Sequence, residues 1–446
     1  MTDDHQPTPP GGVGRALAPL RLPAYRRLAT ALVLSTFASG VWAVAIVWEV
    51  IRIGGGPEQL SVVAASGTVG VLVPALLGGV VADRVPQKVV LLADASFQAF
   101  AMGFAAVLAS LGLTSVLSLS LIAVALGVSV AFYYPAYSAW VPALVPADQL
   151  QAVNGFEGMV RPGIHQAVGP GVAGAVIAAV NPALAMGVAA AASGLAFVAV
   201  LTVPRTAVRR DPQSAGAHSV GAVFADLREG ARYLLRTPWL LGTLLFAALA
   251  MLVMLGPMEV LIPFLVKDHL GGGPQDHSYV LAAFGIGGAS AALAMATARL
   301  PRRYLSVMVL GWGLAGLPFA VIGMTDHLWA VVASGFVIGG LFSAPQVIWG
   351  TLLQRRVPSD LLGRVSSLDF FVSVSLMPAS MALAGPVASL IGLRTTFLVV
   401  AAVPIAAAVV TVFAARMPRD EAAHPLDHAT ADQTAGVSSE SHVTRR

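Results

Sequence analysis

Long apolar runs alternate with short polar connections from residue 28 to residue 415. Each run can cross a bilayer, because about 20 helical residues rising ~1.5 Å each span ~30 Å of hydrocarbon. Proline and glycine inside the runs are compatible with membrane helices, since neighbouring groups satisfy the freed carbonyls. The pattern predicts twelve transmembrane helices, at residues 28–50, 61–82, 89–111, 113–139, 151–179, 183–203, 240–266, 278–298, 304–324, 328–353, 364–391 and 395–415.

The polar segments divide these spans six and six. Within the longest one, Val220 to Arg236 predicts a basic amphipathic helix on the inner membrane surface, with a plain linker helix as the simpler alternative to a regulatory one. We expect no cleavable signal in the polar N-terminal segment. The tail lacks apolar periodicity, so we expect the tail to be disordered. The predicted units are an N-terminal segment 1–27, bundle 28–203, linker 204–239, bundle 240–416 and tail 417–446.

An internal repeat supports the division into halves. Residues 145–160 and 357–372 align at an offset of 212, with six of sixteen positions identical. Similar offsets in successive connections indicate a duplicated six-helix unit. The same offset places Glu157 opposite Asp369, and Glu49 lies 210 residues before Glu259. These acid pairs indicate either a functional two-fold site or duplication alone.

Composition and charge narrow the class further. The 446 residues are 57% hydrophobic and 11% charged, which excludes an ordinary soluble globule, and the absence of cysteine excludes disulfides and thiolate metal sites. With the N-terminus inside, 22 of the 26 Lys and Arg residues fall on the inner side. We therefore expect a multi-pass plasma-membrane protein with both termini cytoplasmic. Dispersed basic residues do not favour nucleic acid, and without a phosphate-binding loop, catalytic triad or metal-ligand spacing we expect neither an enzyme nor a metalloprotein.

A tight polar turn between the second and third spans carries a recognisable pattern. It runs Gly79-Val-Val-Ala-Asp-Arg-Val-Pro-Gln-Lys88. It resembles the major facilitator superfamily signature Gly-x-Leu-Ala-Asp-Arg-x-Gly-Arg-Lys, from which it departs at Val81, Pro86 and Gln87. The resemblance implies the major facilitator fold: an all-α membrane protein with twelve transmembrane helices in two pseudo-symmetric six-helix bundles. It implies a gating turn that closes the inner side, formed by Gly79, Asp83, Arg84, Lys88, Asp94 and Asp369, with Asp94 supporting the turn and Asp369 where helix 11 meets Asp83.

Residues 353–367, followed by Met377-Pro378 and Gly385-Pro386, resemble the branch with siderophore exporters and macrolide-type drug effluxers, as do residues 20–35. The resemblance implies export. Gly169, Pro170 and Gly174 resemble the helix 5 antiporter motif, although His165 replaces its first glycine; small-residue packing without a direction preference is the alternative.

Helix 5 also holds the densest ionisable group. Glu157, Arg161 and His165 are spaced by four, so they share one face of a regular helix over ~12 Å. Intramembrane charges normally face a cavity or a partner, which indicates either a proton or substrate relay or a Glu157–Arg161 pair buried against helix 8. Glu49 and Glu259 are further proton-coupling candidates, which the resemblance places beside a central cavity. The alternative is that both simply reach the outer headgroups.

Together with the resemblance, the sequence therefore predicts a secondary active transporter: a proton-coupled exporter that moves a hydrophobic or amphiphilic small molecule, such as an antibiotic, drug or siderophore, by alternating access.

 The expected partners are a small-molecule substrate, the lipid bilayer and protons, with no cofactor beyond the proton gradient, and we expect a monomer. Two alternatives remain: a proton-driven nutrient importer, and a membrane receptor or assembly protein that does not transport.

Overall fold

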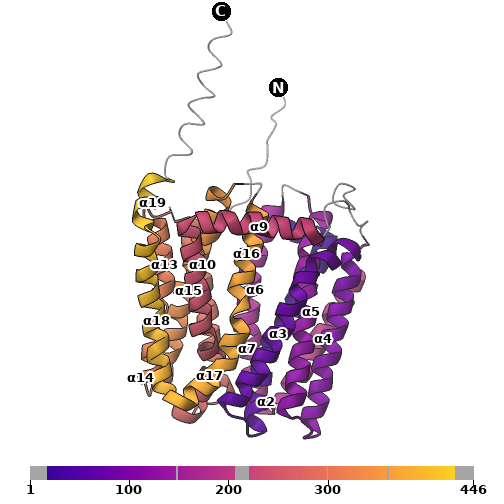
Figure 1. Cartoon of the computed structure of the whole chain (residues 1–446). Coiled ribbons are helices and arrows are strands. Elements are labelled where there is room, and N and C mark those ends of the chain that lie inside the picture. The colour runs from indigo at the N-terminus through magenta and orange to yellow at the C-terminus, as the bar shows by residue number, and fades with distance from the viewer. Residues whose placement is uncertain (1–17, 147–148, 206–219, 299, 359–360, 427–446) are drawn as a thin grey trace, which may run out of the picture.

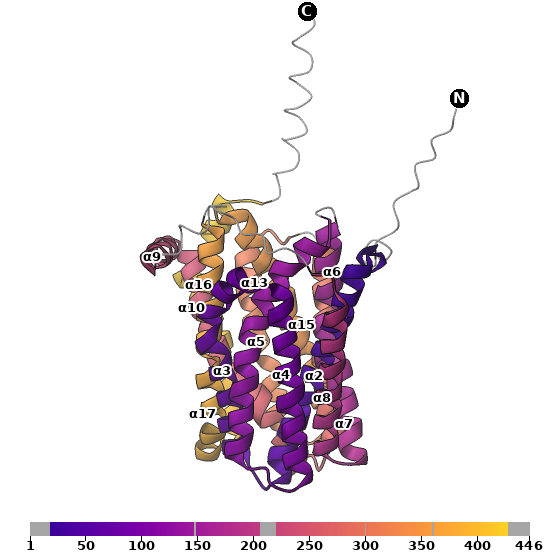
Figure 2. The same ribbon diagram turned by 90° about the vertical axis from the view of Figure 1, so that its right-hand side faces the viewer.

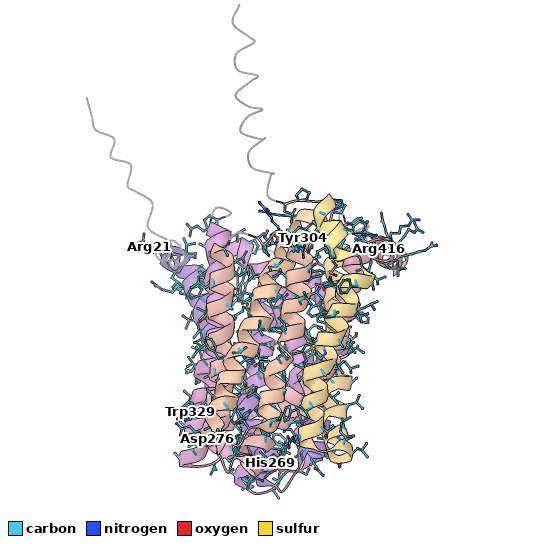
Figure 3. All side chains as sticks on the ribbon, turned by 90° about the vertical axis from the view of Figure 1, so that its left-hand side faces the viewer. Arg21, His269, Asp276, Tyr304, Trp329 and Arg416 are labelled. Atoms are coloured by element: carbon cyan, nitrogen blue, oxygen red, sulfur yellow. The ribbon has the colours of Figure 1, made fainter. Side chains whose placement is uncertain are left out.

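The structure is a computed structural model that describes residues 18–146, 149–205, 220–298, 300–358 and 361–426. Its long helices run side by side in one bundle (Figure 1). Arg21, Tyr304 and Arg416 lie near the end of the bundle where the described chain begins and ends, which we call the termini end (Figure 3). His269 and Trp329 mark the opposite end, called the far end.

The first half of the chain follows the predicted order of spans. A short 3₁₀ turn, η1 (Ala18–Arg21), leads into the first long helix. The fifth span is interrupted by a π-helical segment, η3, so it consists of three pieces. The elements are α2 (Pro23–Arg52), α3 (Pro57–Arg84), α4 (Gln87–Ser110), α5 (Val116–Leu144), α6 (Leu150–Pro162), η3 (Gly163–Val168), α7 (Gly169–Ala179) and α8 (Pro182–Thr202).

The second half repeats this arrangement after a linker helix. Its first span contains two π-helical segments, η5 and η6, and its third and fifth spans are each divided into two helices. The elements are α9 (Val220–Arg236), α10 (Pro238–Gly256), η5 (Pro257–Leu261), α11 (Ile262–Phe264), η6 (Leu265–His269), α12 (Pro274–Thr297), α13 (Tyr304–Leu314), α14 (Leu317–Met324), α15 (Leu328–Arg356), α16 (Leu362–Ser375), α17 (Met377–Ile391), α18 (Leu393–Ala414) and α19 (Met417–Ala423).

Ten segments are long and apolar enough to cross a membrane, judged on the described residues. They correspond to ten of the twelve predicted spans. The other two predicted spans, 61–82 and 151–179, are also helical, as α3 and as the rod formed by α6, η3 and α7. The all-helical membrane architecture is therefore confirmed, and the count of twelve remains a prediction for those two segments.

The far-end turns are short and use glycine where the chain reverses. Gly54, Gly112, Gly271 and Gly392 have φ values of 82°, 70°, 64° and 84°. Glycine adopts this left-handed conformation without the steric cost that a Cβ would add, so it can end a helix within one residue. As a result, the helices that meet at the far end are closely tied to each other.

The linker helix α9 lies across the long helices (Figure 1) and to one side of the bundle (Figure 2). Its helical range, Val220–Arg236, is the one predicted. Glu229 of α9 accepts a 2.6 Å hydrogen bond from Arg364, and Gly230 packs against Arg364 and Leu368 of α16. The linker helix is thus attached to the termini-end half of the eleventh span.

The tail begins later than the sequence predicted. Residues 417–423 form α19, and Glu421 accepts hydrogen bonds of 2.6 and 3.0 Å from the backbone N–H and hydroxyl of Ser306. Asp420 pairs with Arg356. These bonds to the start of α13 and the end of α15 hold the first part of the predicted disordered tail in place; residues 427–446 lie outside the described residues.

The hydrophobic packing differs between the two ends of the bundle. At the far end, one continuous cluster joins both halves, with Val44 and Val63 from the first half and Val260, Val280 and Met381 from the second. At the termini end, each half has its own cluster. Tyr25 and Trp140 belong to the first-half cluster, and Trp239 and Trp349 belong to the second-half cluster.

Two helix pairs make the far-end junction. The backbone N–H of Gly385 in α17 donates a 2.8 Å hydrogen bond to the hydroxyl of Ser61 in α3. On the other side, Gly174 of α7 packs so closely against Ser278 of α12 that a Cβ at this position would overlap the serine hydroxyl. Small residues allow such close approach between membrane helices. The halves are therefore packed together at the far end and hold separate cores at the termini end.

Candidate functional site

A cavity of about 720 Å³ lies mainly within the second half. Pro162 and Gln166 contribute to it from α6 and η3 of the first half. Eleven of its 25 lining residues are methionine or aromatic, and a pocket of this size and character suits a small organic molecule. Its apolar and aromatic lining includes Phe246, Met251, Met254, Met258, Phe284, Trp312, Phe319, Phe342, Trp349, Phe370 and Met377.

Two acidic side chains also line this cavity. Asp369 lies on α16 and accepts a 3.0 Å hydrogen bond from the indole Nε1–H of Trp349 on α15. The Ser373 hydroxyl, one helical turn further along, provides a second hydrogen bond. Both partners are neutral, so the carboxyl group is held in place by hydrogen bonds without a paired cation.

Glu259 is the second acid of the cavity. It lies in the π-helical segment η5, which follows Pro257, and its residue surface is exposed to the cavity. π-Helical turns inside longer helices frequently occur at functional sites. Among the described residues, no hydrogen bond or ion pair to the Glu259 carboxyl group is present. A carboxyl group that faces a cavity away from bulk water, without a partner, is expected to attract positive charge.

Glu157 occupies a different environment in the first half. Its carboxylate accepts hydrogen bonds from the hydroxyls of Tyr137, at 2.5 Å, and Tyr25, at 3.3 Å, and forms a 3.2 Å ion pair with Arg161. The Arg161 guanidinium also lies over the rings of Tyr137 and Tyr134, 4.9 and 5.5 Å from their centroids. Glu157 and Arg161 therefore pair with each other, which was one of the two alternatives from the sequence. Their other partners come from α2 and α5, and not from the eighth predicted span, which is α12.

His165 lies in η3, where the backbone changes from α-helical to π-helical at Gly163. The His165 ring bonds to the backbone of Thr36, and its carbonyl packs against Gly40 of α2. Glu157 also contacts α2, through the hydroxyl of Tyr25. Among the described contacts, no bond joins His165 to Glu157 or Arg161, so the proposed relay of the three groups stays a prediction.

The predicted antiporter-like glycines are packing positions in this structure. Gly169 lies against Gly40, where a Cβ would come within 2.8 Å of the Gly40 Cα. Gly174 packs against α12 at the far-end junction described above, and Pro170 is buried between these two positions. The three residues thus place the fifth span against both its own half and the opposite half.

Glu49 is fully buried at the far end and does not line the cavity described here. Arg52 donates hydrogen bonds of 2.8 and 2.7 Å to its carboxylate, and the Thr114 hydroxyl donates one of 2.5 Å. These bonds connect the end of α2 to the turn before α5. The expectation that Glu49 faces a cavity as the counterpart of Glu259 is therefore wrong, since Arg52 and Thr114 enclose it.

The predicted gating turn is only partly described. The surroundings of Gly79 and the side chains of Asp83 and Arg84 are not among the described parts of the chain. The Lys88 ammonium donates hydrogen bonds of 2.8 and 2.5 Å to the carbonyls of Leu201 and Val203, where a cation suits the end of α8. Asp369 of α16 accepts a hydrogen bond from Trp349 of α15. Its predicted meeting with Asp83 involves a side chain outside the described residues and stays a prediction.

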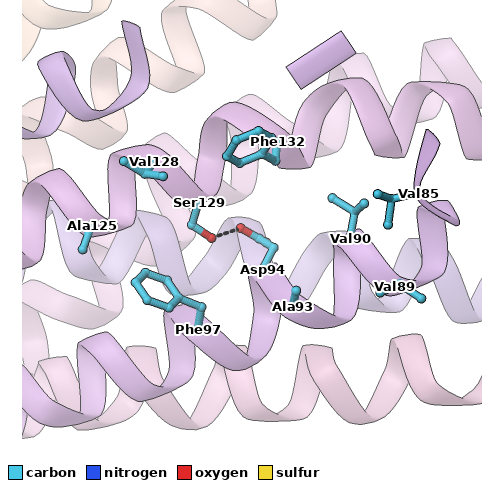
Figure 4. Close-up of a pocket in the computed structure, with 10 residues that line it drawn as sticks. All are labelled: Val85, Val89, Val90, Ala93, Asp94, Phe97, Ala125, Val128, Ser129 and Phe132. Carbon is cyan, nitrogen blue, oxygen red and sulfur yellow. Dashed lines mark hydrogen bonds between the residues drawn. The ribbon is translucent and has the colours of Figure 1, made fainter. Parts of the chain in front are cut away.

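Asp94 faces α5 and not the turn that it was expected to support. It accepts a hydrogen bond of 2.5 Å from Ser129 (Figure 4) and one of 2.9 Å from Gln98. It lines a second cavity of about 610 Å³ between α4 and α5, whose other walls are largely apolar. With its carboxyl group enclosed by these neutral donors, Asp94 ties the third span to the fourth.

Sequence reasoning missed the tyrosine and tryptophan partners of the duplicated acids. Tyr137 and Trp349 are separated by the repeat offset of 212, as are Glu157 and Asp369. Both aromatic residues donate a hydrogen bond to the acid of their own half. The offset applied to every aromatic residue near the repeat would have found this pair. Arg161 corresponds in the same way to Ser373, so the two halves differ at the position that could supply a cation.

Comparison with known proteins gives consistent matches over most of the chain. The profile of a family described as transmembrane secretion effector matches residues 14–441. The multidrug efflux pump Tap of Mycolicibacterium fortuitum is 28% identical over 394 residues, covering 85% of this chain and 92% of that protein. The enterobactin exporter EntS of Salmonella typhi is 28% identical over 353 residues, covering 78% and 81%.

Solved transporter structures share the fold at low sequence identity. The nucleoside transporter NupG superposes with a TM-score of 0.67 at 13% identity, covering 87% of this chain and 98% of that one. A bacterial homologue of the lysosomal transporter Spinster, in an inward-facing and occupied conformation, gives a TM-score of 0.64 at 14% identity and covers 90% and 98%. These similarities establish the arrangement of the helices.

Proposed function

Because the chain belongs to the transmembrane secretion effector family of the major facilitator superfamily, we propose that it exports an amphiphilic small molecule by proton-coupled alternating access. The observation that carries this proposal is the acid-bearing cavity beside a bundle that is packed together at one end only. Transporters of this architecture expose a midplane site to each side in turn by rocking one half against the other.

Export is favoured over import by the relatives. Proteins named as a multidrug efflux pump and as an enterobactin exporter align with most of this chain. The cavity can accept cargo of the size of many drugs, and its methionine-rich wall can adapt to different shapes. We therefore propose drug or siderophore efflux as the physiological class of activity.

The closed far end supports an inward-facing state for this structure. The excess of Lys and Arg in the termini-end connections favours a cytoplasmic position for that end, with both termini inside. Closure at the far end then means closure toward the outside. Transport requires the far-end contacts of α3 with α17 and of α7 with α12 to separate while the termini end closes.

Asp369 and Glu259 are the proposed proton-coupling groups. Both line the cavity, and neither forms an ion pair with a described basic side chain. Competition between a proton and a cargo for the same carboxyl groups would link the two fluxes. Glu157 is less suited to this role, since Arg161 already compensates its charge.

Flux in inside-out membrane vesicles with an imposed pH gradient tests the proposal. A fluorescent amphiphilic drug should accumulate in these vesicles when the protein is present, and addition of the drug should dissipate the gradient. The Asp369→Asn variant should show neither effect, whereas Asp326→Asn, which changes an exposed far-end acid, should behave as the wild type.

The two alternatives predict other outcomes in the same assay. An importer would accumulate the drug only in right-side-out vesicles. A receptor or assembly protein would move no drug in either orientation and leave the gradient intact. Accumulation without any change in the gradient would contradict proton coupling while leaving export in place.

A further inference from the structure

We infer that the cavity is built to hold the cationic group of an amphiphilic cargo at Glu259 and Asp369. This inference rests on the proposed transport function, and it adds the charge class of the cargo. Among the described residues that line the cavity, these two acids are the only charged side chains. A molecule that enters therefore meets two acids and no base.

Glu259 offers the more accessible acceptor. It faces the cavity from η5, and no described protein group bonds to its carboxyl oxygens. A carboxylate removed from bulk water gains from a nearby cation more than an exposed one does, because the lower dielectric strengthens their attraction. An ammonium, amidinium or phosphonium centre on the cargo would provide the missing partner.

Asp369 offers a second acceptor whose orientation is already fixed. Trp349 and Ser373 each bond to its carboxyl group, and both are uncharged. Their hydrogen bonds leave the charge of an ionised carboxylate uncompensated, although they fix its direction. A cargo cation that reaches Asp369 therefore pairs with a preoriented group and loses little freedom in doing so.

The first half of the protein contributes no opposing positive charge. Its lining residues, Pro162 and Gln166, are neutral. Arg161, next to Pro162, is paired with Glu157 and lies over two tyrosine rings, and His165, next to Gln166, bonds to the backbone of Thr36. The charge that could have attracted an anionic cargo is thus already used within the first half.

The apolar wall suits the remainder of such a cargo. Aromatic rings attract a cation through their faces, and methionine side chains adapt to irregular shapes. Phe284 and Met258 share the cavity with Glu259, and Phe370 shares it with Asp369. The arrangement predicts discrimination against multiply charged anions.

Two probes of nearly equal size and opposite charge test this inference. Tetraphenylphosphonium is a permanent lipophilic cation, and tetraphenylborate is a lipophilic anion of similar shape. Binding of each to the purified full-length protein in nanodiscs is measured without any gradient, and the signal of protein-free nanodiscs is subtracted. The wild type should bind the cation at least roughly tenfold more tightly than the anion, a difference of about 1.4 kcal/mol.

The matched variants are Glu259→Gln, Asp369→Asn and the double variant. Each single change should reduce the cation-to-anion preference, and the double variant should remove it. The ratio of the two affinities is measured on the same preparation, so a loss of folded protein does not change it. Asp326→Asn, which alters an exposed acid outside the cavity, should keep the wild-type ratio.

The outcomes separate this inference from the function on which it rests. Equal or tighter binding of tetraphenylborate, or a double variant that keeps the wild-type preference, would overturn the cation assignment even if efflux continues. Cation-selective binding that depends on the two acids, with no flux in vesicles, would support the assignment and contradict the transport function.

Discussion

The Glu157 and Asp369 environments are two versions of one duplicated site. In both halves an acid on the fifth span of the half accepts a hydrogen bond from an aromatic residue on the fourth span, Tyr137 or Trp349. The difference lies one turn further along the acid's own helix, where the first half has Arg161 and the second has Ser373. One duplicated acid has become part of an internal ion pair, and the other remains available to the cavity.

This difference shows how, after duplication, one copy of an acid can stabilise the fold while the other copy is available for transport. An ion pair with hydrogen bonds to both partners holds its helices in one arrangement, since loss of either partner leaves an uncompensated charge. A carboxyl group with neutral donors can change its protonation or its partner at lower cost. The comparison predicts effects on stability in the first half and effects on transport in the second.

The largest effect is expected when the first-half arrangement is copied into the second half. In Ser373→Arg, the new guanidinium would lie one turn from Asp369 and pair with it, as Arg161 does with Glu157. We expect drug efflux in inside-out vesicles to fall by about 100-fold, since loss of a single charged interaction of this kind costs ~3 kcal/mol. Ser373→Ala should retain most of the activity, and an active Ser373→Arg protein would contradict the role of an uncompensated Asp369.

The converse change should act on stability. Arg161→Ser removes the cation beside Glu157 and leaves a mostly buried acid with tyrosine partners only. We expect the free energy of unfolding to fall by about 3 kcal/mol, as for other ion pairs that lose one member inside a protein. Thermal unfolding in nanodiscs measures the change. The double variant Glu157→Gln/Arg161→Ser should recover much of the loss, and if it does not, the pair is not the cause.

A smaller effect is expected at the aromatic donors. Tyr137→Phe removes the 2.5 Å hydrogen bond to Glu157 and should lower the free energy of unfolding by about 1–2 kcal/mol. Trp349→Phe removes the 3.0 Å hydrogen bond to Asp369 and should reduce efflux more than it reduces stability. Unfolding and flux are measured for both variants. Equal profiles for the two would show that the halves do not differ in the proposed way.

The smallest effect is expected at the linker helix. Glu229→Gln removes the partner of Arg364 in an exposed ion pair, and such pairs contribute at most about 1 kcal/mol. Both stability and efflux should stay close to the wild type. A strong loss of efflux with unchanged stability would indicate that α9 regulates the termini-end part of the eleventh span and is more than a linker between the two halves.

The sequence allowed much of the fold to be predicted, because apolar length and charge bias depend on the bilayer alone. The helix α9 also followed from its amphipathic pattern. The π-helical segments η3 and η5 could not be foreseen, since their backbone bonds depend on packing against other helices. The bond of His165 to the backbone of Thr36 could not be foreseen from the sequence either, because it depends on how η3 packs against α2.

The candidate site was less accessible to sequence reasoning. The repeat identified Glu157 and Asp369 as counterparts, but the number of residues between them says nothing about which acid meets a cation. Glu49 and Glu259 were also paired by spacing, and their surroundings turned out to differ because Arg52 and Thr114 enclose only Glu49. Three-dimensional neighbours decide the role of an ionisable residue inside a membrane.

The glycine turns at the far end have a mechanical consequence. Gly54 joins α2 to α3 and Gly392 joins α17 to α18 with almost no spare chain, so neither member of these pairs can slide far along the other. The connection from Val203 to Thr237, by contrast, is long and lies at the other end. We therefore expect the transport cycle to move the two six-helix halves relative to each other, while the helices within each half keep their arrangement.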